Sequence, residues 1–205
     1  VPWIITGIFM AVRKAGETWW LRAGVFGFGF ILLLMMISPV FISPLFNDYK
    51  PLAEGPVKSA IFSLARANQI PTDNVVYFDA SKQTTRVSAN VSGFAGTTQV
   101  SLNDNLLNKT SLPEIKAVMG HEMGHYVLNH SLRLAVYFSL TIMFGFWFVH
   151  VVLDKVIARF GVKYGITERT DPAVLPIALT VFSFLMLLLT PVTNSIVRQA
   201  EKEAD

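Results

Sequence analysis

The 205-residue chain is 52% hydrophobic and 15% charged, with a formal net charge of +3. Charged residues are scarcer than in soluble globular domains, which indicates a membrane protein, and the basic residues are too scattered for a nucleic-acid-binding patch. The chain contains no cysteine, which excludes disulfides, cysteine-ligated zinc and a cysteine nucleophile.

Three uncharged stretches, residues 24–46, 134–153 and 173–193, predict transmembrane helices, because each is long enough to cross the hydrocarbon core. Residues 1–23 are expected to be a juxtamembrane segment or the tail of an upstream span. They end in basic and aromatic residues typical of a membrane interface. A soluble protein of this size would have to bury all three stretches, so buried helices are the weaker alternative.

Residues 47–133 form a predicted soluble insert between the first two spans. Apolar residues at helical spacing predict a helix from Gly55-Pro56 to Asn68. A strand over 75–80, a hairpin over 86–102 and a short helix over 103–108 are predicted to follow.

A long helix is predicted to begin at Ser111, because Ser111 and Glu114 have the spacing of a capping box. No clear signal ends it before Leu153, so we expect one helix that runs into the second span. A loop over 154–172 then leads to the third span. Residues 194–205 continue that span as a helix. The chain starts without Met and ends within this pattern, so we expect it to be part of a longer protein.

The segment His121-Glu-Met-Gly-His125 lies on the long helix. Residues four apart lie about 40° apart around a helix axis, so both imidazoles can bind one ion. Glu122 lies about 60° from His125 and can reach a metal-bound water without binding the metal. The short pattern also occurs by chance, and its position on a helix is what favours a metal site.

Zinc held by these two histidines needs a third protein ligand and keeps one position open for water. Zinc lowers the pKa of that water and polarises a peptide carbonyl, and Glu122 is predicted to act as the general base. Gly124 is costly in a helix interior but allows another backbone to come close. Ordinary helix packing is the alternative explanation for Gly124.

Span counting identifies Glu201 as the third ligand. His125 lies nine residues before the second span, and Glu201 lies eight residues after the third. The two spans form a hairpin, so both residues emerge on one side of the membrane, about 12–14 Å above the span ends.

The segment around Glu201 carries one polar helix face, formed by Asn194, Arg198, Glu201 and Asp205. A solvated helix end would explain this face if the histidines were absent. Glu203 is the rival ligand, but it points about 200° away from Glu201, so Glu201 is preferred.

Two further histidines are predicted to lie outside the metal site. His130 follows His121 by nine residues, which places it about 180° around a continuous helix, facing away from the site, so we expect a structural or exposed side chain. His150 has no acidic neighbour at helical spacing within its span, so we expect a packed or interfacial side chain.

The HEMGH helix and the C-terminal segment resemble, in order, the two metal motifs of peptidase family M48. This family of membrane-bound peptidases includes the CAAX prenyl proteases and the HtpX-like heat-shock proteases. Further segments resemble the prenyl-protease branch, at residues 43–46, 49–55, 81–82, 88–90, 100–102 and 104–107.

The resemblance implies one Zn²⁺ per chain on His121, His125 and Glu201, with Glu122 as the base. It implies that Asp205 orients a ligating histidine, with His121 as the preferred candidate. Two other polar residues, Arg198 and Asn194, would support the site. The family also continues past this C-terminus, with a histidine thought to stabilise the transition state.

The family binds its substrate as an added strand beside an edge strand near the zinc. Here that strand maps onto Asn90, Val91 and Ser92, in the hairpin that continues to Thr98. The eukaryotic prenyl proteases commonly have Asn-Ala-Tyr where this chain has Asn-Val-Ser. This departure puts prenylated substrates in question and favours a bacterial-type quality-control or processing role.

We therefore expect a mainly α membrane protein with three or more transmembrane helices and a zincin-like α+β catalytic region containing a small antiparallel sheet. The expected function is hydrolysis of peptide bonds in membrane-associated or prenylated polypeptides. By resemblance, the membrane is a bacterial inner membrane or an ER-type membrane, and the active site faces the cytoplasm. A non-catalytic scaffold that retains the metal site and a structural subunit without metal are the alternatives.

Overall fold

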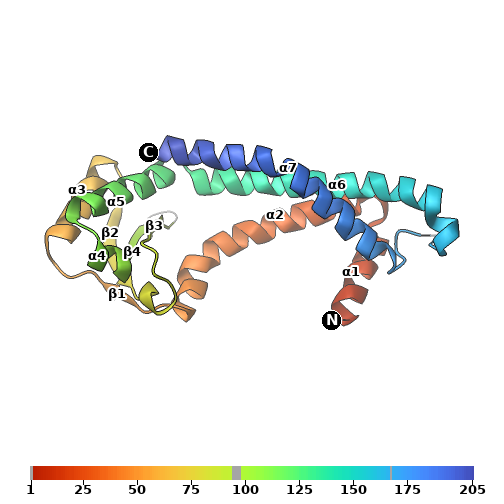
Figure 1. The fold of residues 1–205 in the computed structure, drawn as a ribbon. Helices are drawn as coiled ribbons and strands as arrows, with labels where there is room; N and C mark the ends of the chain where they lie inside the picture. Colours follow the sequence, from red (N-terminus) through yellow and green to blue (C-terminus); the bar gives the residue numbers. More distant parts are fainter. Residues whose placement is uncertain (1, 94–97, 167) are drawn as a thin grey trace. The chain divides into compact units, whose positions relative to one another are not determined.

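The computed structural model describes residues 2–93, 98–166 and 168–205. The chain divides into two compact units, which are described separately. Unit 1 comprises residues 1–31 and 135–195, and unit 2 comprises residues 32–134 and 196–205. The long helices α2, α6 and α7 each contribute residues to both units (Figure 1).

Unit 1 is built from long apolar helices. The elements that contribute to it are α1 (Pro2–Ala15), the 3₁₀ turn η1 (Gly16–Thr18), α2 (Trp19–Ile37), α6 (His130–Tyr164) and α7 (Val174–Ala204). Three stretches of these helices are long and apolar enough to cross a membrane, namely Met10–Ile37, His130–Lys163 and Val174–Ala204. The expected mainly helical membrane fold is thus confirmed.

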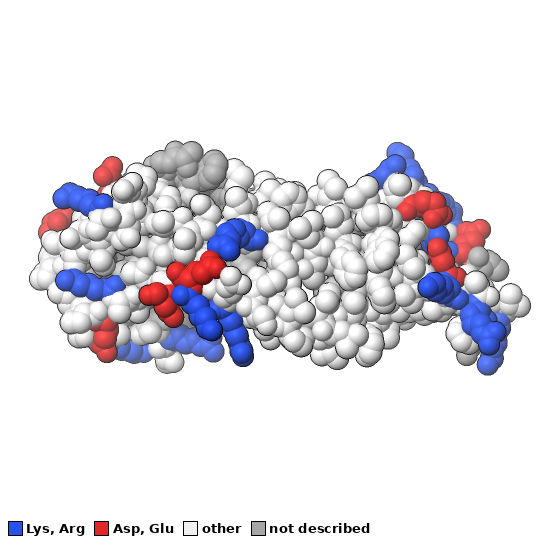
Figure 2. All heavy atoms as spheres, turned by 90° about the horizontal axis from the view of Figure 1, so that it is seen from above, with Lys and Arg blue, Asp and Glu red and all other residues white. Residues whose placement is uncertain are grey.

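Large apolar side chains cover the outside of unit 1. Phe26, Phe184 and Leu187 each expose more than half of their surface, as lipid-facing residues of a spanning helix do. The face of α6 and α7 seen in Figure 2 has a broad area without charged side chains.

Glycines allow the helices of unit 1 to come close to one another. A Cβ atom added to Gly24 of α2 would lie 2.6 Å from the side chain of Met143 on α6. One added to Gly145 of α6 would lie 2.6 Å from the ring of Phe182 on α7. Small residues at helix contacts are the usual packing device inside membranes.

Polar contacts in unit 1 join η1 and the start of α2 to α6 and to the loop that follows α6. The guanidinium of Arg169 donates to the carboxylates of Asp154 and Glu17, and these contacts raise its pKa, with Asp154 the larger cause. The Trp19 indole N–H donates to Nδ1 of His150 at 3.1 Å. His150 is thus packed against an aromatic ring, as expected.

Unit 2 contains a four-stranded sheet and the helices packed on it (Figure 1). After the π-helical turn η2 (Ser38–Ile42) and the 3₁₀ turn η3 (Ser43–Leu45), its elements are β1 (Tyr49–Pro51), α3 (Pro56–Ala67), β2 (Thr72–Phe78), η4 (Ala80–Lys82), β3 (Ala89–Ser92), β4 (Thr98–Asn103), α4 (Asp104–Lys109) and α5 (Leu112–Val127). The predicted helix after Gly55-Pro56 and the β3–β4 strand pair are both present.

The sheet is mixed, which corrects the expectation of an antiparallel one. The strand order is β1-β2-β4-β3; β1 and β3 pair antiparallel with their neighbours, but β2 and β4 are parallel. The reason is that the chain leaves β2, forms β3 at the edge, and turns back into the position beside β2. β4 therefore runs in the same direction as β2.

The core of unit 2 lies between the sheet and helices α3, α4 and α5. Its buried apolar side chains come from these elements and from the loop after α3: Ile61, Ala65, Ile70, Val75, Ala89, Val100, Leu102, Leu106, Ile115, Met119 and Met123. The side chain of Asn103 links the sheet to α4, because its oxygen accepts from the backbone N–H groups of Leu106 and Ser88. This packing gives α5 a rigid support.

The long helix predicted from Ser111 to Leu153 is wrong, because it is broken at residues 128 and 129. α5 ends at Val127, and α6 begins at His130. Between them Asn129 has a φ of 54°, in the left-handed region. Asn tolerates this region better than most residues and commonly ends a helix in this way.

Candidate metal centre

Helix α5 begins at the predicted capping box. The Glu114 carboxylate accepts from the backbone N–H and the hydroxyl of Ser111, both at 2.7 Å, and these bonds lower the pKa of Glu114. The buried side chains of Ile115, Met119 and Met123 hold one side of α5 on the core. His121 and His125 are thereby fixed in the last two turns of the helix.

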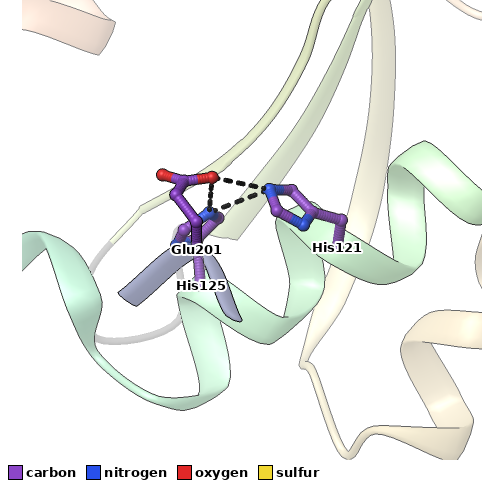
Figure 3. A group of neighbouring side chains, drawn as sticks. All are labelled: His121, His125 and Glu201. Carbon is purple, nitrogen blue, oxygen red and sulfur yellow. Dashed lines mark hydrogen bonds and ion pairs between the residues drawn. The ribbon is translucent and has the colours of Figure 1, made fainter. Parts of the chain in front are cut away.

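The structure brings His121, His125 and Glu201 together (Figure 3). The Nε2 atoms of the two histidines are 3.1 Å apart. Oε2 of Glu201, on α7, lies 3.3 Å from Nε2 of His121 and 3.6 Å from Nε2 of His125.

These distances fit a tetrahedral zinc ion. Zinc–ligand bonds of about 2.0–2.1 Å place the ligand atoms of a tetrahedron about 3.4 Å apart. The three separations lie on both sides of that value, and the donor set of two imidazoles and one carboxylate suits zinc. Three protein ligands leave the fourth position for water or substrate.

Gly124 allows the carboxyl end of α7 to reach α5. A Cβ atom at this position would lie 2.7 Å from the carbonyl oxygen of Ala204 and 3.0 Å from its Cα atom. No side chain larger than hydrogen fits there without a shift of α7. The close backbone approach expected from the sequence is therefore made by the same helix that carries Glu201.

The electrostatics of α5 suit the predicted roles of its side chains. Burial raises the pKa of Glu122, and the nearby Glu201 adds to this effect while His121 opposes it. A carboxylate with a raised pKa is a better proton acceptor near neutral pH. Burial also lowers the pKa of His125, which favours the neutral imidazole that a metal needs.

Asp205 is the predicted supporting residue that the structure places at the site. Its Oδ1 atom lies 2.7 Å from Nδ1 of His121, so the carboxylate can fix the ring with Nε2 directed at the ion. Arg198 and Asn194 are exposed and have no hydrogen bond or ion pair to the described residues. Their predicted supporting role stays a prediction.

The predicted substrate strand corresponds to β3. Asn90, Val91 and Ser92 pair with β4 on one side, and β3 is the edge strand of the sheet. β3 also packs against α5, the helix of the HEMGH segment. Residues 94–97 of the predicted hairpin lie outside the described residues.

The prediction that His130 faces away from the site is wrong: its side chain lies beside His121, His125 and Glu201, the candidate metal-binding group. Only 2% of the residue is exposed. Its Nδ1 atom is 2.9 Å from Nδ1 of His125, and its Nε2 atom is 3.1 Å from Oε2 of Glu203. The angular count assumed a continuous helix, whereas the turn at Asn129 brings His130 back towards α5. Asn129 itself was the signal in the sequence that could have revealed the break.

Two models of related protein families match nearly the whole chain. Residues 51–205 match peptidase family M48, and residues 1–48 match the model described as CAAX prenyl protease N-terminal, five membrane helices. The second match includes the candidate span Met10–Ile37.

Individual proteins give the same picture. The chain is 34% identical to the uncharacterized metalloprotease YhfN of Bacillus subtilis, over 96% of this chain and 46% of that protein. It is 38% identical to CAAX prenyl protease 1 of Saccharomyces cerevisiae, over 57% of this chain and 26% of that protein. The crystal structure of S. mikatae Ste24p matches 100% of this chain and 51% of its own, with a TM-score of 0.76 and 25% identity.

The chain thus spans about half the length of these relatives, or less. The match to the family model nevertheless includes α5 and α7, which carry His121, His125 and Glu201. The chain belongs to peptidase family M48.

Proposed function

We propose that this chain is the metal-binding part of a membrane zinc metalloendopeptidase. The observation that carries the proposal is the grouping of three ligand atoms, all within 4.8 Å of one another, on two segments 76 residues apart in the sequence. One Zn²⁺ would be held by His121, His125 and Glu201. When bound, it would activate a water molecule and polarise the carbonyl of the peptide bond.

The side chains of the chain have distinct tasks in this function. Glu122 accepts a proton from the attacking water and passes it to the leaving amine. Asp205 holds the ring of His121. Glu122 follows His121 directly on α5. Its carboxylate interacts electrostatically with His121 and Glu201 but is not part of the ligand group.

We propose that the substrate binds along β3. An extended peptide could pair with the free edge of this strand, as in β-augmentation, and α5 lies next to that strand. The names of the relatives favour membrane-associated or prenylated polypeptides. Asn90, Val91 and Ser92 would then provide the backbone groups that align the peptide with the metal.

Substitution of Glu122 by Gln tests the proposed mechanism. The variant should bind zinc as the parent does, because Glu122 is not a ligand, and should lose about 10²–10⁴-fold in the rate of peptide cleavage. Zinc content and cleavage of a quenched peptide are measured on the same detergent-purified sample. Equal cleavage by the variant and the parent would show that the base is wrong, and a parent with zinc but no cleavage would favour the non-catalytic scaffold.

We further propose that the spans lie at residues 24–46, 134–153 and 173–193 and that unit 2 faces the cytoplasm. The absence of native cysteine in this chain allows a direct test. Lys116 is exposed on α5; a Lys116→Cys variant should be labelled by an impermeant maleimide only after the cytoplasmic side is opened. Labelling of intact cells from outside would show that unit 2 faces the opposite side of the membrane.

A further inference from the structure

The two histidines of the metal-binding group differ in what supports their second ring nitrogen. Both direct Nε2 towards Glu201, so Nδ1 of each is left to another partner. For His121 that partner is the carboxylate of Asp205. For His125 it is a third imidazole, that of the buried His130.

The contact between His125 and His130 fixes the positions of the protons. A neutral histidine that binds metal through Nε2 carries its proton on Nδ1. Nδ1 of His130, 2.9 Å away, must then be the acceptor. Its own proton therefore lies on Nε2, where Oε2 of Glu203 can accept it at 3.1 Å.

Glu203 is held in place for this task by two further donors. Nη1 of Arg133 donates to its Oε2 at 2.7 Å, and Nε2 of Gln199 donates to its Oε1 at 3.0 Å. Arg133 and His130 lie on the first turn of α6, while Gln199 and Glu203 lie one turn apart on α7. The arrangement connects α5, α6 and α7 within unit 2.

We infer that His130 and Glu203 form a positioning relay for His125. His130 links the Glu203 carboxylate to His125 through two hydrogen bonds. These bonds hold the His125 ring in the tautomer and orientation that present Nε2 to the metal. His130 itself binds no metal. The inference rests on the proposed metal centre, and it explains why a histidine is buried beside that centre.

The test compares zinc affinity in His130→Leu and His130→Asn with that of the parent chain. Leu fills the buried space but has no acceptor, so zinc affinity should fall about 10–100-fold, as when other supporting hydrogen bonds to a ligand are lost. Asn places an oxygen near the position of Nδ1 and can accept from His125, so it should recover most of that loss. Affinity is measured by competition with a chromogenic chelator, and the visible spectrum of the Co²⁺-loaded protein reports the ligand geometry.

His150→Leu is the matched control, because it makes the same change at a hydrogen-bonded histidine in unit 1. Its zinc affinity should equal that of the parent. The relay is refuted if His130→Leu binds zinc as tightly as the parent, or if Asn is no better than Leu. A parent that binds no zinc would instead refute the metal centre.

If His130→Leu does not fold, Glu203→Gln provides the second test. The amide oxygen of this variant can still accept from His130 and Arg133, but it lacks the negative charge. Zinc affinity should therefore fall, but by less than the loss expected for His130→Leu. Circular dichroism should show unchanged helix content. Unchanged zinc affinity in this folded variant would overturn the relay.

Discussion

In unit 2 the apolar side chains are enclosed by protein, whereas in unit 1 many of them point outwards. Leu102 and Met119 of unit 2 are fully buried, while Phe26 of unit 1 is 75% exposed and Leu187 is 66% exposed. The apolar side chains are therefore covered in two ways: unit 1 depends on lipid to cover its helices, and unit 2 encloses its own. The candidate metal-binding group lies in unit 2, where buried side chains hold the helix that carries His121 and His125.

The two units should differ in how much the truncation of a leucine destabilises them. Leu102→Ala should destabilise unit 2 by about 2–5 kcal/mol, because a cavity forms among rigidly packed side chains. Leu187→Ala, the same change on the outside of unit 1, should have an effect within about 0.5 kcal/mol. Hydrogen exchange of the detergent-solubilised protein measures both. Equal destabilisation would show that the two units are packed alike.

Removal of zinc should destabilise unit 2 but not unit 1. Bound zinc at 100 times its dissociation constant would stabilise unit 2 by about 2.7 kcal/mol. A chelator should therefore increase hydrogen exchange in α5 and at the end of α7, and should leave the spans of unit 1 unchanged. Uniform loosening of the whole chain would contradict a metal centre confined to unit 2.

Two glycines one turn apart on α5 should respond in opposite ways to substitution by alanine. Gly124→Ala forces a Cβ atom against the backbone of Ala204, so it should cost about 1–3 kcal/mol and weaken zinc binding by displacing Glu201. Gly120→Ala meets no atom within 4 Å and should stabilise the helix by about 0.5–1 kcal/mol. Thermal unfolding and chelator competition are measured together, and opposite signs are expected for the two variants.

The smallest expected effect concerns the turn between α5 and α6. Asn129→Ala must keep a φ near 54°, which costs about 1 kcal/mol for a residue with a Cβ atom. Asn129→Gly should be close to neutral, because glycine accepts this conformation freely. If alanine instead joined α5 and α6 into one helix, His130 would leave His125, and zinc affinity would fall as well.

Local signals in the sequence were sufficient for much of this architecture. The capping box at Ser111 and the strand pair β3–β4 depend on neighbouring residues, and both are found in the structure. Three helices long and apolar enough to cross a membrane are also present. The position of Glu201 near His125 could also be anticipated. Both residues lie a similar number of helical residues from the ends of two consecutive spans, which places them at the same height above the membrane even when the packing is unknown.

Features that depend on one backbone angle or on distant pairing could not be obtained in this way. A single left-handed residue, Asn129, invalidated the angular position assigned to His130, because helical angles add up only while the helix is continuous. The parallel pairing of β2 with β4 joins segments separated by β3, and no local pattern encodes such an exchange of neighbours.

The position of Glu201 has a consequence for the biosynthesis of the protein. This residue follows nearly all of α7 in the sequence, while His121 and His125 precede α6. The ribosome therefore completes the two histidines long before the carboxylate exists, and the carboxylate reaches them only after two further helices have entered the bilayer. A chain in which α7 is not yet inserted, or is misplaced, lacks the third candidate ligand at the site. Assembly of the group therefore requires that both α6 and α7 have been inserted.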